Sequence, residues 1–134
     1  MDWKLELIIL PVADVDRAKR FYLDKLGFTL DVDHSAGEDF RIVQLTPPGS
    51  ACSVTLMRKP ESAGSVQGLH LIVTDIEAAH AELTARGAEV SEVFHFANGL
   101  RTSGPDPARG VYNSFVSLTD PDGNGWLVQE VNRT

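Results

Sequence analysis

Short apolar runs and helical stretches follow one another along the chain, and the same order occurs twice. Residues 7–27 read LIILPVADVDRAKRFYLDKLG, and residues 68–87 read GLHLIVTDIEAAHAELTARG. In each segment the apolar, β-branched run predicts a strand, an Asp caps the helix that follows, and a Gly ends that helix. Repetition at half the chain length predicts two similar modules.

Further strand patterns complete each module. They lie at residues 28–32, 40–45 and 52–57 in the first half and at 88–96, 113–118 and 125–131 in the second. The pattern predicts an α+β fold of two βαβββ modules, residues 1–59 and 66–134, joined by a linker at 60–65. A module of roughly 60 residues is marginal alone, so we expect a single domain with one shared core.

The segment 97–112 departs from the repeat. It is about twice as long as an ordinary connection in a compact domain and is rich in Gly and Pro, which predicts a long loop. Its Arg101, Arg109 and Tyr112 are candidates for holding an anionic or aromatic ligand. The alternatives are a disordered surface loop and solvated loop charges.

Charge and composition exclude several kinds of partner. The 134 residues carry a formal net charge of −7, which opposes binding to nucleic acid or to an anionic membrane surface. No apolar run approaches the ~18 residues of a membrane span, and the N-terminal residues lack the basic region of a signal peptide. We therefore expect a cytoplasmic protein, and a lone Cys52 suits that reducing compartment.

Three motifs carry a resemblance to a known family. The segments DVDRAKRFYLDKLGF, DIEAAHAELTARGAEV and DPDGNGWLVQE occur in this order. Together they resemble the vicinal oxygen chelate superfamily, the glyoxalase, bleomycin-resistance and extradiol dioxygenase group. The resemblance covers nearly the whole chain and implies a curled, cup-shaped mixed β-sheet with helices outside and a ligand cavity inside.

Metal-dependent relatives place ligands on the first and last strands of each module. The corresponding positions of this sequence carry Leu7, Gly68 and Leu127, and the fourth falls near Ser53 or Thr55. Leu and Gly offer no donor atom, and hydroxyls are weak metal ligands. The resemblance therefore implies the scaffold without its usual metal site, and we expect no metal or other cofactor.

Strand alternation extends these positions into a candidate site, because residues two apart share a face. Ile9 then joins Leu7, His70 joins Gly68, and Gln129 joins Leu127. The predicted ligand-binding residues are Leu7, Ile9, Ser53, Thr55, Gly68, His70, Arg101, Arg109, Tyr112, Leu127 and Gln129. His70 and His95 are also candidate acid/base groups, with a hydrogen-bonded structural histidine as the alternative for each.

Two functions from different classes are consistent with this pattern. The first is a metal-independent binding protein, similar to the antibiotic-sequestering branch of the family, that holds an apolar or aromatic small molecule, with a homodimer completing the pocket. The second is a metal-independent lyase, isomerase or cyclase that uses His70 or His95 beneath the long loop. A metal-dependent enzyme with a displaced site that includes His70 is a variant of the second.

Overall fold

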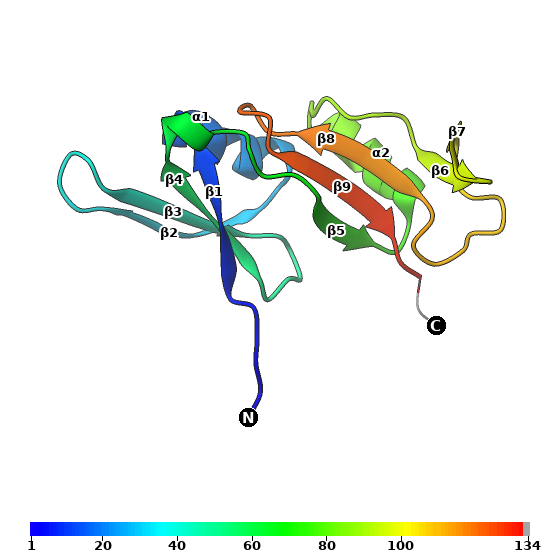
Figure 1. The fold of residues 1–134 in the computed structure, drawn as a ribbon, viewed down its shortest axis with the longest axis horizontal. Helices are drawn as coiled ribbons and strands as arrows, with labels where there is room; N and C mark the ends of the chain where they lie inside the picture. The colour runs from blue at the N-terminus through cyan, green and yellow to red at the C-terminus, as the bar shows by residue number, and fades with distance from the viewer. Residues whose placement is uncertain (133–134) are drawn as a thin grey trace. The chain divides into compact units, whose positions relative to one another are not determined.

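A computed structural model describes residues 1–132 (Figure 1). The chain divides into two compact units, one formed by residues 1–66 with 120–124 and the other by residues 67–119 with those from 125 onward. Each unit contains a mixed sheet with a helix, which confirms the predicted α+β class. Among the described residues, no helix is long and apolar enough to cross a membrane.

The first unit contains a four-stranded sheet. Its elements are β1 (Leu7–Val12), α1 (Val15–Arg20), the π-helical turn η1 (Phe21–Lys25), β2 (Thr29–Ser35), β3 (Arg41–Thr46), β4 (Ser53–Arg58) and the 3-10 turn η2 (Pro60–Ser62). The strand order is β1-β4-β3-β2, with β1 parallel to β4 and the other pairs antiparallel. This is the βαβββ order predicted for the first half.

One face of this sheet packs against α1 and η1. Leu10 of β1 and Leu56 of β4 are fully buried there, together with Ala18 and Tyr22 of the helix. The predicted cap is confirmed, because the Asp14 side chain accepts a hydrogen bond from the Arg17 amide at 3.1 Å. The opposite face, which carries Leu7, has no helix of this unit on it.

The turn at residues 120–124 forms a buried polar cluster within the first unit. Asp120 Oδ2 accepts hydrogen bonds from the Tyr22 hydroxyl and from Asn124 Nδ2, both at 2.8 Å. Asn124 Nδ2 also donates to the carbonyl of Pro11 at 3.1 Å. The DPDGN segment therefore forms a turn that also satisfies buried groups of β1 and η1.

The second unit contains a five-stranded sheet, one strand more than predicted. Its elements are β5 (Leu69–Val73), α2 (Ile76–Ala85), β6 (Phe94–Ala97), β7 (Leu100–Ser103), β8 (Phe115–Thr119) and β9 (Gly125–Glu130). The strand order is β5-β9-β8-β6-β7, with β5 parallel to β9. Its helix-side core contains Trp126 and Val128 of β9 with Ile76 and Leu83 of α2.

The prediction of one long loop at 97–112 is wrong for its first part. Asn98 and Gly99 have φ angles of 54° and 76°, and they connect β6 to β7 as a two-residue hairpin. An Asn-Gly pair suits such a turn because both central residues of a type I′ turn need positive φ. The strand predicted at 88–96 is correspondingly shorter and begins only at Phe94.

Candidate functional site

The candidate site is the helix-free face of the five-stranded sheet. His70 pairs with Leu127 and Ile72 with Gln129 across the parallel β5 and β9, and Gln129 pairs with Phe115 of β8. Because paired residues point to the same side, these side chains share the face opposite Trp126 and Val128. Ile72 is 58% exposed, so the described chain leaves apolar surface open on this face.

Three phenylalanines form the centre of this face. The rings of Phe94 and Phe115 stack with centroids 5.5 Å apart, and Phe96 meets them edge-on at 6.0 and 5.7 Å. Phe94 and Phe115 are buried, whereas Phe96 is 46% exposed. Each such ring pair contributes about 0.5–1.5 kcal/mol beyond the area it buries. Phe94, Phe96 and Phe115 form an aromatic triad, in which two buried rings pack against the third and the Phe96 ring is available to a ligand.

Asn113 binds the backbone of the residue that carries the exposed ring. The amide N–H of Phe96 donates to Asn113 Oδ1 at 3.1 Å, and Asn113 Nδ2 donates to the carbonyl of Phe96 at 3.1 Å. The side-chain amide of Asn113 therefore makes the two hydrogen bonds that a neighbouring strand would otherwise make, and it satisfies both the N–H and the carbonyl of Phe96. A ligand that stacks on Phe96 would meet a backbone that is already ordered.

Arg101 of β7 lies beside the aromatic triad. It pairs in register with Phe96, and its guanidinium carbon lies 3.7 Å from the centroid of the Phe94 ring. A cation over an aromatic face gains about 0.5–1 kcal/mol at an exposed site. Within residues 1–132 the Arg101 side chain has no carboxylate partner. Its N–H groups are therefore available for a ligand.

The two candidate histidines point to different faces. His70 is exposed on the helix-free face, and its Nδ1 lies 2.7 Å from the carbonyl of Gly68. Since a carbonyl only accepts, Nδ1 donates in this contact, and Nε2 has no hydrogen-bond partner among the described residues. His95 follows Phe94 on β6, is buried, and lies 2.7 Å from the carbonyl of Gly104 through Nδ1. The structure does not bring His70 and His95 together.

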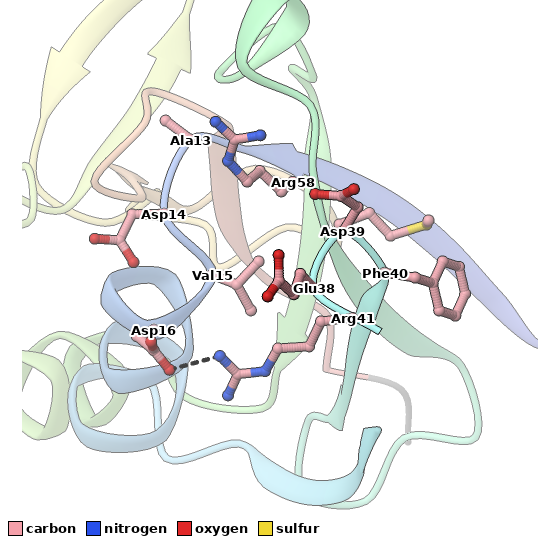
Figure 2. Close-up of a pocket in the computed structure, with 10 residues that line it drawn as sticks. Ala13, Asp14, Val15, Asp16, Glu38, Asp39, Phe40, Arg41 and Arg58 are labelled. Carbon is pink, nitrogen blue, oxygen red and sulfur yellow. Dashed lines mark hydrogen bonds and ion pairs between the residues drawn. The ribbon is translucent and has the colours of Figure 1, made fainter. Parts of the chain in front are cut away.

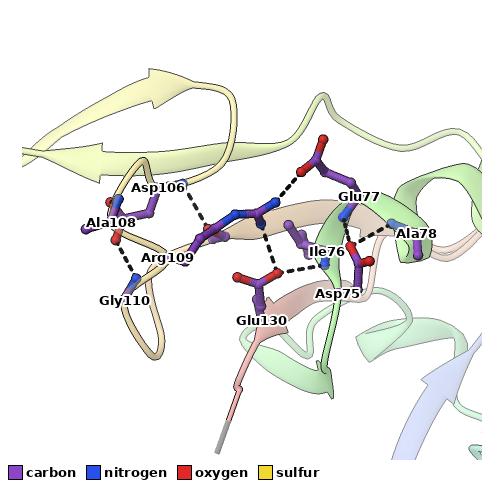
Figure 3. A network of polar contacts seen from close by, with 10 residues as sticks. Asp75, Ile76, Glu77, Ala78, Asp106, Ala108, Arg109, Gly110 and Glu130 are labelled. Atoms are coloured by element: carbon purple, nitrogen blue, oxygen red, sulfur yellow. Dashed lines mark hydrogen bonds and ion pairs between the residues drawn. The ribbon is translucent and has the colours of Figure 1, made fainter.

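The predicted ligand-binding residue Arg109 forms ion pairs within the protein (Figure 3). Its Nη1 lies 3.0 Å from Glu130 Oε1, and its Nη2 contacts Glu77. Glu130 Oε1 also accepts a hydrogen bond from the Ile76 amide at 3.0 Å, at the start of α2. The Arg109 guanidinium therefore links the loop to β9 and α2, and sequence reasoning missed both of its partners.

Backbone contacts order the remainder of this loop. The carboxylate of Asp106 accepts hydrogen bonds from the amides of Ala108 and Gly110, and these bonds lower the pKa of Asp106. The amide of Tyr112 donates to the carbonyl of Glu130 at 3.2 Å, and Gln129 Nε2 donates to the carbonyl of Tyr112 at 3.1 Å. The predicted site residues Gln129 and Tyr112 are thus in direct contact.

The helix-free face of the first unit carries the other predicted positions. Leu7 pairs with Ser53 and Ile9 with Thr55, and the Ser53 hydroxyl lies 2.7 Å from that of Thr46. The Thr55 hydroxyl is buried and has no hydrogen-bond partner among the described residues. Leu7 and Ile9 offer no donor atom for a metal, and Ser53 and Thr55 beside them offer only hydroxyls.

The residues present do not fit the metal site of the family's metal-dependent members. Gly68 immediately precedes β5 and Leu127 lies on β9, and neither side chain has a donor atom. Across the described part of the chain, no three His, Cys, Asp or Glu side chains gather as a ligand set. Nitrogen and oxygen donors of this kind are what divalent metals require.

A separate pocket of about 820 Å³ lies within the first unit (Figure 2). It is bordered by the start of α1, the β2–β3 connection and the end of β4, and its charged residues are Asp14, Asp16, Glu38, Asp39, Arg41 and Arg58. Arg41 reaches across it to Asp16, with 2.7 Å between Nη1 and Oδ1. Sequence analysis did not predict this pocket.

Beside this pocket, Asp33 is expected to make stability depend on pH. Hydrogen bonds from Arg41 and then Lys19 lower the pKa of Asp33 in the folded protein. A carboxyl group whose pKa is lower in the folded than in the unfolded protein stabilises the fold at pH values above the unfolded pKa of about 3.9. This contribution is lost as the pH falls from there toward the folded-state pKa. Asp33→Asn should therefore cost about 0.5–1 kcal/mol at pH 7 in urea unfolding, and less at pH 3.

Asp39→Asn is the matched control for this measurement. Asp39 is also exposed, and its removal changes the net charge equally, but its carboxylate has no ion pair among the described residues. We expect this variant to change stability by less than about 0.5 kcal/mol. An equal loss of stability for Asp33→Asn at both pH values would contradict the ion-pair explanation.

Fold and sequence together define the class of protein. Two modules, each a mixed sheet whose first and last strands are parallel neighbours, carry the motifs quoted above. The chain belongs to the glyoxalase/bleomycin resistance protein/dioxygenase superfamily, whose family model matches residues 4–128. This confirms the resemblance seen in the sequence.

Two solved structures and one protein sequence illustrate what this chain is similar to. The chain is 29% identical to TnmS3, described as an antibiotic binding protein from Streptomyces sp. CB03234, with 97% of each chain covered and a TM-score of 0.75. A glyoxalase/bleomycin resistance protein from the same organism is 30% identical over 95% of this chain and all of that one, with a TM-score of 0.71. Bacillus subtilis YetH, an uncharacterized protein, is 26% identical over 89% of this chain and 91% of its own.

Proposed function

We propose that this protein binds an apolar or aromatic small molecule on the helix-free face of its five-stranded sheet, without a metal. The observation that carries the proposal is the aromatic triad, in which the exposed Phe96 ring is supported by Phe94 and Phe115. Small-molecule sites combine such apolar walls with a few polar groups, here Arg101, His70 and Gln129. The similarity to TnmS3, an antibiotic binding protein, supports the same class of function.

The remaining parts of this proposal rest on the family. Metal independence is supported by Leu7, Gly68 and Leu127 at the usual ligand positions, and a stoichiometric divalent metal in the purified protein would contradict it. A single domain, a homodimer and a cytoplasmic location are also proposed. The exposed Ile72 supports the homodimer, because a second copy would remove its apolar surface from water. A monomer in sedimentation equilibrium would contradict it.

Titration with polycyclic aromatic compounds tests the binding function. We expect saturable binding by calorimetry and an affinity about tenfold lower for Phe96→Ala, because the ligand loses its stacking surface. Phe40→Ala is the matched control, since Phe40 is also 46% exposed but belongs to the first unit. Absence of saturable binding, or equal losses in the two variants, would count against the proposed site.

A second candidate function is acid/base catalysis by His70. The observation that favours it is the free Nε2 of His70 on the same face as the aromatic triad. If a compound that binds is also converted, as followed by NMR, His70→Gln should abolish conversion and leave binding within about threefold. Full conversion by that variant would exclude His70 as the acid/base group.

A further inference from the structure

We propose that the ligand is a planar aromatic anion, with its ring stacked on Phe96 and its carboxylate or phenolate held by Arg101. This inference rests on the proposed function and specifies the chemistry of the molecule bound. It follows from the charges that the five strands place on the helix-free face and from the pairing of Arg101 with Phe96.

The strands themselves place a single full charge on the helix-free face; the Glu92 carboxylate reaches Ser103 from the segment before β6. The structure describes every residue of β5 to β9, and the Asp, Glu, Lys and Arg residues of these strands are Arg101 and Glu130. Glu130 is buried on the helix side, where it contacts the Ile76 amide. Arg101 is therefore the strand charge that a ligand on the aromatic triad would meet, and its sign selects an anion.

The Arg101 side chain is exposed, and a contact with the Phe94 ring also fixes its position. Contact with the Phe94 ring at 3.7 Å places the guanidinium of Arg101, whose edge carries the N–H donors. Such an edge matches the two oxygens of a carboxylate. Glu92 provides a carboxylate nearby, but it accepts a hydrogen bond from the Ser103 hydroxyl at 3.0 Å and forms no ion pair with Arg101.

Register brings the cation and the ring close together. Arg101 and Phe96 face each other across β6 and β7, where Cβ atoms of opposed residues are about 4.5–5.5 Å apart. The Arg101 guanidinium lies over Phe94, whose ring centroid is 6.0 Å from that of Phe96. An acidic group directly on a stacked ring suits this arrangement, which favours aryl acids over aromatics with a remote charge. Arg109, the other candidate for an anion, is already paired with Glu77 and Glu130.

Calorimetric titration with naphthalene-2-carboxylate and the uncharged naphthalene-2-carboxamide tests the inference. The two probes have the same ring and nearly the same shape, so their difference isolates the charge. We expect the carboxylate to bind the wild-type protein at least tenfold more tightly. Arg101→Gln should remove most of that preference by weakening the carboxylate about tenfold, while affinity for the carboxamide changes less than threefold.

Arg58→Gln is the control variant, because Arg58 is an exposed arginine of the first unit and its loss changes the net charge equally. It should keep the preference for the carboxylate. Equal affinity for the two probes, both weakened by Phe96→Ala, would overturn the anion preference and leave the binding site intact. If neither probe binds, the aromatic-binding function fails together with the inference.

Discussion

Replacing Asp120 by alanine is expected to lower the free energy of unfolding by about 3–5 kcal/mol. Asp120 is 4% exposed, and its two side-chain oxygens accept hydrogen bonds from Tyr22, from the Asn124 side chain and from the amides of Asp122 and Asn124. Truncation leaves these donors in the interior without an acceptor, at about 1–3 kcal/mol for each group that finds no water. Urea unfolding followed by far-UV circular dichroism measures the loss.

Tyr22→Phe provides the graded comparison for this cluster. It removes one hydroxyl and keeps the ring of a fully buried side chain, so the loss should be about 1–1.5 kcal/mol. Asp39→Ala, which removes an exposed carboxylate, should change stability by less than about 0.5 kcal/mol. If Asp120→Ala behaves like Asp39→Ala, the turn does not stabilise the first unit in the way described.

Replacing Glu130 by alanine is expected to cost about 2–4 kcal/mol. Glu130 is 4% exposed, and its Oε1 binds both the Ile76 amide and Arg109 at 3.0 Å. The variant leaves a buried amide at the first turn of α2 without an acceptor and removes one of the two carboxylates that hold Arg109. Faster hydrogen exchange at the Gly110 and Tyr112 amides, beside a lower urea midpoint, would report the loosened loop.

Two further variants separate the contributions of Glu130. Glu130→Gln keeps an oxygen for the Ile76 amide and should recover part of the stability. Glu77→Ala removes the exposed partner of Arg109 and should cost at most about 1 kcal/mol, as exposed ion pairs contribute little. A loss for Glu77→Ala as large as that for Glu130→Ala would contradict a dominant role of the buried carboxylate.

Several elements followed from local patterns. Asp14 and Asp75 cap the helices predicted from them, and the strand predicted ahead of the second helix is β5. These features depend on residues within one or two turns of each other, so periodicity and capping chemistry suffice to predict them. The strand β7 was missed although its signal, Asn98-Gly99, is equally local.

The aromatic triad could not be predicted in this way. Phe94 and Phe96 belong to β6 and Phe115 to β8, and their contact depends on β6 lying next to β8 in the sheet. Ion pairing of Arg109 likewise depends on Glu77 and Glu130, which are 32 and 21 residues away in sequence. The loop composition indicated that both Arg101 and Arg109 could bind a ligand. In the fold Arg109 is paired, and only Arg101 of the two remains available.

Local sequence was therefore enough for the repeated strand-helix order and the capped helices, because these depend on side-chain chemistry and periodicity over short stretches of the chain. The positions at which Leu7, Gly68 and Leu127 stand in place of metal ligands were implied by the resemblance to the family. Only the tertiary structure decided that Arg101 rather than Arg109 stays without an ion pair, that Phe96 is the exposed ring of the aromatic triad, and that His70 rather than His95 shares their face. Those outcomes depend on strand order and register, which pair residues far apart in sequence and which no single segment specifies.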